Sequence, residues 1–148
     1  MSTDEAVTKD LIETLEDGKE GFGKGAEKLD KDNSSELGAA FRQLSAQRAR
    51  FSAELRELAK DYGDKVNESG SLVGTLHRGW LSLKDALTGD DPKGVLDAAK
   101  QGEEHAVKEY EKALGEDISA GLRIVVQRQF TEVKAALAQV QSLRNSRN

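Results

Sequence analysis

Three polar residues interrupt apolar stripes whose spacing of three and four residues is typical of one face of an α-helix. They are Arg48, Glu103 and Gln129, and each is bracketed by apolar residues one helical turn away on both sides. When each helical hairpin is folded about its turn, all three positions fall near mid-helix. The sequence therefore predicts a polar layer across the centre of an otherwise apolar helical bundle.

An ion pair is the simplest chemistry for this layer, because a buried charge persists only when it is paired. We expect Arg48 to pair with Glu103, and Gln129 to complete the hydrogen bonds of the pair. Two other interpretations stay open. The Arg48 side chain could extend to the surface, or the layer could hold a metal ion or a small ligand.

A carboxylate at mid-bundle is also the first requirement of a di-metal centre. Such a centre takes a Glu from each of two helices and a Glu-x-x-His motif from each of the other two. That motif is absent, because a glycine stands three residues before each of the two histidines. Glu103 is the one carboxylate that clearly points inward, so we expect no catalytic residue, no cofactor and no complete metal site. A divergent iron or manganese site would need Glu103 together with Glu16, Glu54 and a histidine.

Five helices must position these residues. Capping residues and helix breakers, such as Asp91-Pro92 before a helix and Gly115 after one, delimit them. Short connections indicate that the first two helices and the last two form antiparallel hairpins. We expect an all-α fold, a ferritin-like four-helix bundle of two antiparallel hairpins joined by a crossover that carries a shorter fifth helix. A single domain covers residues 1–148, with helices at 3–31, 34–62, 71–88, 92–114 and 118–144.

Gly18, Gly21 and Gly25 share one face of the first predicted helix, which we call the glycine face. Three glycines on one face indicate close approach of another element, either the crossover helix or a second subunit. Trp80 is expected to anchor the crossover on the bundle, as buried aromatic residues usually do. His77, three residues earlier, is expected to be structural or exposed.

Composition excludes several classes of function. The chain of 148 residues has no cysteine, which removes disulfides, thiolate metal sites and cysteine nucleophiles. A net charge of −5 argues against nucleic-acid binding. No apolar run is long enough for a membrane span, and the N-terminus lacks the pattern of a signal peptide. We expect a cytoplasmic protein that binds neither nucleic acid nor membrane.

Four stretches of the sequence carry a resemblance to a known family. They are residues 48–55, 74–80, 102–110 and 127–129, and the His-Arg-Gly-Trp segment at 77–80 is the most distinctive of them. Together they resemble an uncharacterised bacterial family that is catalogued as a domain of unknown function and described as a ferritin-like four-helix bundle. The resemblance implies a bacterial, cytoplasmic protein with the two-hairpin fold, and it implies no reaction.

The expected function is that of a non-catalytic interaction or stress-associated protein that lacks a complete di-metal site. Self-association, or binding of an unidentified protein partner, would use the glycine face or the outside of the crossover. The alternative is a divergent ferritin-like protein that binds iron or manganese through carboxylates.

Overall fold

Four long helices make up most of the computed structural model, which describes residues 3–62 and 78–146. Shorter helical segments follow α2 and precede α5. The described part of the chain contains no strand, so the prediction of an all-helical protein is confirmed. The long helices are α1 (Thr3–Lys31), α2 (Ser35–Leu58), α5 (Pro92–Leu114) and α6 (Ala120–Asn145), and the short ones are η1 (Ala59–Tyr62), η2 (Arg78–Trp80) and α4 (Leu83–Ala86).

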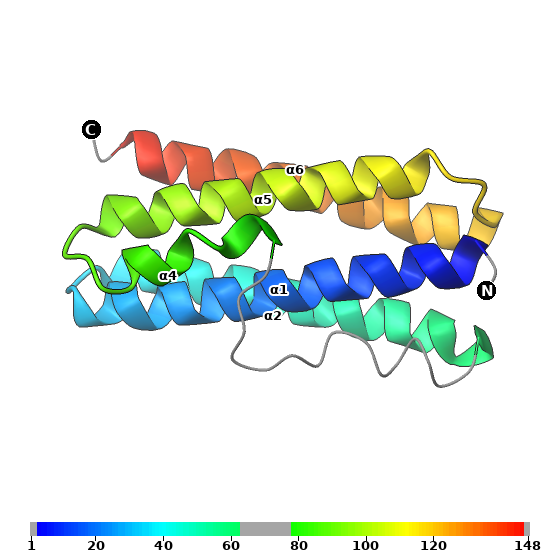
Figure 1. Cartoon of the computed structure of the whole chain (residues 1–148), viewed down its shortest axis with the longest axis horizontal. Coiled ribbons are helices and arrows are strands. Elements are labelled where there is room, and N and C mark those ends of the chain that lie inside the picture. The colour runs from blue at the N-terminus through cyan, green and yellow to red at the C-terminus, as the bar shows by residue number, and fades with distance from the viewer. Residues whose placement is uncertain (1–2, 63–77, 147–148) are drawn as a thin grey trace.

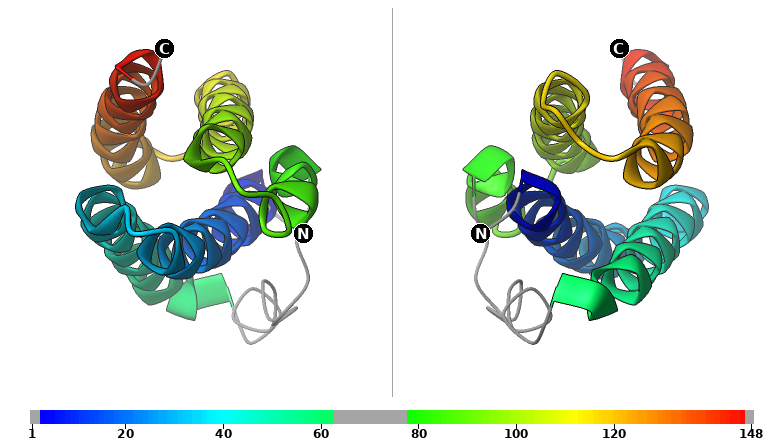
Figure 2. Two further views of the ribbon diagram at one scale, coloured as in Figure 1. Left: turned by 90° about the vertical axis from the view of Figure 1, so that its left-hand side faces the viewer. Right: turned by 90° about the vertical axis from the view of Figure 1, so that its right-hand side faces the viewer.

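The four long helices form two antiparallel hairpins that lie against each other (Figure 1). α1 pairs with α2 and α5 pairs with α6, while α1 also contacts α5 and α2 contacts α6 (Figure 2). Each long helix runs antiparallel to both of its neighbours. α1 is continuous through all of its glycines.

Local sequence chemistry sets the helix ends. Asn33 adopts a φ of 62° in the turn between α1 and α2, a left-handed conformation that asparagine tolerates better than most residues. The Asp91 side chain accepts a hydrogen bond of 2.9 Å from the backbone N–H of Lys93 at the start of α5. Ser119 accepts the corresponding bond from Leu122 at the start of α6. The turns at Asn33 and Ser119 allow each hairpin to close within a few residues, while Asp91 fixes where α5 begins after the crossover.

The crossover differs from the expected continuous helix at 71–88. Its residues 71–77 lie outside the described residues, and over residues 78–88 the prediction is wrong, because η2 and α4 are separate short helices. Packing explains the break. The backbone at Gly79 lies so close to α5 that a Cβ there would be 2.5 Å from the Cβ of His105. The Trp80 and Leu83 side chains are both buried, so contacts with the bundle override a weak helical preference.

Buried apolar side chains form two clusters, one toward each end of the bundle. Leu15, Phe51 and Ala106 belong to the first cluster, whereas Phe22 and Leu44 belong to the second. Arg48 and Glu103 therefore lie at the boundary between the two clusters.

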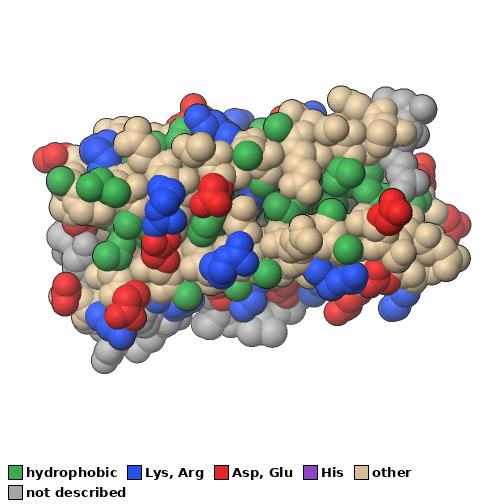
Figure 3. Space-filling view, turned by 180° about the vertical axis from the view of Figure 1, so that it is seen from behind, with side chains coloured by type: hydrophobic (Ala, Val, Ile, Leu, Met, Phe, Trp, Pro, Cys, Tyr) green, Lys and Arg blue, Asp and Glu red, His purple; other side chains and the backbone are tan. Residues whose placement is uncertain are grey.

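Surface charges are interspersed rather than segregated on the face seen in Figure 3. Ion pairs link neighbouring long helices at the surface. They include Asp30 with Arg42 and Glu16 with Arg56 between α1 and α2, Glu54 with Arg128 between α2 and α6, and Asp97 with Arg144 between α5 and α6.

Candidate functional site

Arg48 and Glu103 form a buried ion pair between α2 and α5. Their side chains are 1% and 0% exposed, respectively. Arg48 Nη1 donates to Glu103 Oε1 at 2.5 Å, and Nη2 donates to Oε2 at 2.6 Å. Because both carboxylate oxygens accept from one guanidinium, the pair has the bidentate geometry that is typical of strong arginine–carboxylate contacts.

Helix α1 provides the wall against which Arg48 packs. A Cβ at Gly18 would lie 3.4 Å from both Cγ and Nη1 of Arg48, so the glycine lets α1 lie directly on this side chain. The guanidinium carbon lies 5.4 Å from the centre of the Phe22 ring, within the range of a cation–π contact. Arg48 Nε donates to Gln47 Oε1 at 3.2 Å. Contacts with α1, α2 and α5 thus hold the arginine in place, and its side chain does not extend to the surface.

Gln129 is also fully buried, but it belongs to a different hydrogen-bond network. Its Oε1 accepts from the Tyr110 hydroxyl at 2.7 Å, and its Nε2 donates to Glu54 Oε1 at 2.9 Å and to the Phe51 carbonyl at 3.3 Å. The expectation that Gln129 completes the hydrogen bonds of the ion pair is therefore wrong. The reason lies in its neighbours, because the two valines that bracket Gln129 both belong to the first apolar cluster and not to the boundary.

The Tyr110 hydroxyl has a strongly raised pKa. Burial raises the pKa of Tyr110 well above its ordinary value, and the nearby carboxylates of Glu54 and Glu103 add to the effect while Arg48 opposes it. Nothing in the sequence pattern singled out Tyr110, because a tyrosine in an apolar stripe is indistinguishable from an ordinary core aromatic residue.

We predict that Tyr110 sets an alkaline limit on stability. The folded protein keeps this proton, whereas the unfolded chain releases it above the ordinary pKa of 10.0. The contribution of Tyr110 to the free energy of unfolding is therefore fully present below that pH and falls by about 1.4 kcal/mol per pH unit above it. In Tyr110→Phe this decrease is absent. Urea denaturation of both proteins from about pH 9 to about pH 11 should show their stabilities converging, and parallel curves would contradict the assignment.

The other carboxylates that a metal site would need are directed at separate basic residues. Glu54 pairs with Arg128, and Glu16 lies 3.9 Å from Lys19 and 4.0 Å from Arg56. Across residues 3–62 and 78–146, no three side chains of the His, Asp and Glu types gather in a group that could hold a metal ion. The structure therefore does not bring Glu16 and Glu54 together with Glu103 and a histidine.

The glycine face of α1 is covered by the chain itself. A Cβ at Gly21 would lie 2.3 Å from Trp80 Cε3, and one at Gly25 would lie 2.9 Å from Phe41 Cδ2. Of the two alternatives expected for this face, the structure shows the first, because Trp80 of the crossover packs on Gly21 and Phe41 of α2 packs on Gly25. His77 lies outside the described residues.

Trp80 is inserted between α1 and α5. Opposite Gly21, a Cβ at Gly102 of α5 would lie 2.2 Å from Trp80 Cε2, so two glycines form the slot that receives the indole. The indole also meets the Phe22 ring edge-on, with ring centres 4.9 Å apart. Sequence reasoning missed Gly102, although a glycine in the interior of a predicted helix was a usable signal.

The fold and the site together define an all-helical protein of two packed hairpins, with a crossover wedged between α1 and α5 and a buried ion pair at its centre. A family model described as a domain of unknown function (DUF2383) matches residues 5–116, and the chain belongs to this family. The match includes both members of the ion pair and Trp80, and the expectation of a family of unknown function is confirmed. No curated protein matches the chain. Among the described helices, none is both long and apolar enough to cross a membrane.

Proposed function

We propose that this chain is a non-catalytic interaction protein with a ferritin-like arrangement, in which an ion pair occupies the place of a di-metal centre. The arrangement of the long helices supports this proposal, since two antiparallel hairpins joined by one long crossover are the ferritin-like order. Di-metal proteins of that order build their centres from inward carboxylates at mid-bundle. Glu103 stands at that depth in α5.

The bidentate contact of Arg48 with Glu103 is the observation that carries the proposal. Metal ligation by Glu103 would place a cation directly beside the guanidinium from which both of its oxygens already accept. The positive charge of Arg48 would then stay buried beside the bound cation, at a large electrostatic cost. The pair therefore favours a structural role for Glu103 over a ligand role.

Metal content tests this proposal directly. The full chain is produced in medium supplemented with iron and manganese, purified without a histidine tag, and analysed by mass spectrometry. We expect no stoichiometric metal. One or two metal ions per chain, lost in Glu103→Gln and retained in the matched variant Glu104→Gln, would instead support the alternative of a divergent iron or manganese protein.

A further inference from the structure

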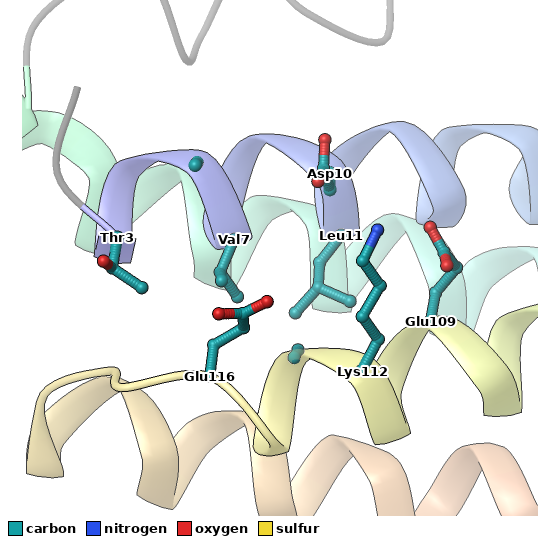
Figure 4. Close-up of a pocket in the computed structure, with 9 residues that line it drawn as sticks. Thr3, Val7, Asp10, Leu11, Glu109, Lys112 and Glu116 are labelled. Carbon is teal, nitrogen blue, oxygen red and sulfur yellow. The ribbon is translucent and has the colours of Figure 1, made fainter.

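A groove of about 360 Å³ opens between the first half of α1 and the last turns of α5 (Figure 4). Its floor is apolar and includes the buried side chains of Val7, Leu11 and Ala113. This volume lies at the lower end of the range of small-molecule sites, roughly 300–1,000 Å³. It is separate from the Arg48–Glu103 pair, which does not line it.

Charged side chains stand at both ends of the groove. Glu116 lies near Val7 toward one end, while Asp10 of α1 and Glu109 of α5 line the other end (Figure 4). Along α1 the lining residues Thr3 and Asp10 are seven residues or about 10.5 Å apart, while Glu116 lies in the turn just after the end of α5. Between Glu109 and Glu116, Lys112 is the one basic residue of the lining, and its ammonium group extends toward α1 between Asp10 and Glu109.

We propose that this groove binds a linear aliphatic amine with a cationic group at each end. One ammonium group pairs with Glu116 and the other with Asp10 and Glu109, while the methylene chain covers Leu11 and Ala113. A carboxylate at each end with an apolar floor between them matches this distribution of charge. A single compact cation would pair with only one end of the groove, and an apolar ligand would pair with neither.

Lys112 acts as the resident cation of the groove. Its ammonium group competes with one end of the ligand for Asp10 and Glu109. Removal of this charge is therefore expected to strengthen binding, whereas removal of the Glu116 charge is expected to weaken it. This inference goes beyond the proposed function and does not depend on the absence of a metal site.

The first test is isothermal titration calorimetry of the full chain with 1,8-diaminooctane at physiological salt. We chose this probe because its extended length is close to two helical turns. We expect saturable binding of one diamine per chain, weaker binding of 1,3-diaminopropane, which is too short to reach both ends, and no binding of uncharged 1,8-octanediol. Absence of saturable binding at millimolar diamine, or equal binding of the short and long diamines, would overturn the proposal.

The diamine affinities of three surface variants distinguish binding in the groove from general attraction of a cation to an acidic protein. We expect Glu116→Gln to weaken binding and Lys112→Met to strengthen it, each by about two- to fivefold, which is the range of an exposed ion pair. Glu111→Gln makes the same charge change on α5 outside the groove and should leave affinity unchanged. If Glu111→Gln weakens binding as much as Glu116→Gln does, the attraction is diffuse and the groove is not the site.

Discussion

Glu103→Gln is expected to lower the free energy of unfolding by about 3–5 kcal/mol, the usual cost of removing one partner of a buried ion pair. The loss is large because the Arg48 guanidinium stays buried between α1, α2 and α5 with no counter-charge. For a chain of this size, the melting temperature should fall by roughly 10 °C. Thermal and urea denaturation followed by circular dichroism measure the change.

Glu104→Gln is the matched control, since it makes the same substitution at the next position of α5. Glu104 lies 3.8 Å from Lys100 and its side chain is 45% exposed, so its loss should change stability by less than about 0.5 kcal/mol. Equal effects of the two substitutions would contradict the central role of the Glu103 pair. The double variant Arg48→Met with Glu103→Leu should recover most of the loss, because apolar residues of similar volume often replace a buried ion pair without cost.

Gly21→Ala is expected to destabilise the protein by about 1–3 kcal/mol, the usual cost of overpacking. The added methyl group would overlap the indole of Trp80, whose Cε3 lies 2.3 Å from the position of the new Cβ. Gly23→Ala, two residues away on the same helix, should have the opposite sign. At Gly23 the nearest atom to a new Cβ is Ser45 Oγ at 3.6 Å, so helix propensity alone should increase stability by up to about 1 kcal/mol.

Fluorescence distinguishes this mechanism from a general loss of helix stability. Trp80 is the only tryptophan of the chain, so its emission reports the slot between α1 and α5 directly. In Gly21→Ala the emission of the folded protein should shift to longer wavelength as the indole leaves its buried position. An unchanged emission maximum together with unchanged stability would show that the slot accommodates a methyl group.

The sequence was sufficient for the features that depend on spacing along one helix. Apolar residues at intervals of three and four, together with delimiting residues such as Asp91 and Gly115, predicted helices where the long helices lie. The interruption of those stripes at Arg48 and Glu103 singled out the two residues that the structure places in contact. A charge in an apolar stripe is informative because an unpaired buried charge is so costly.

Features that depend on how helices lie against each other were beyond reach from the sequence. Gln129 occupies a stripe position just as Arg48 does, yet its depth along the bundle places it beside Tyr110 and Glu54. The break in the crossover follows from the fit of Gly79 and Trp80 against α5, which overrides local helix propensity. The groove between α1 and α5 arises from two segments about 100 positions apart in the chain, and no local pattern joins them.

The ion pair also constrains how the protein assembles itself. Arg48 belongs to the first hairpin and Glu103 to the second, so the two charges meet only where the hairpins dock. If the hairpins docked one helical turn out of alignment, about 5.4 Å, each charge would be buried against apolar side chains without its counterpart. Apolar contacts alone would penalise such a misalignment far less, since one turn of the stripe resembles the next. One arginine and one glutamate thus select a single docked alignment during folding.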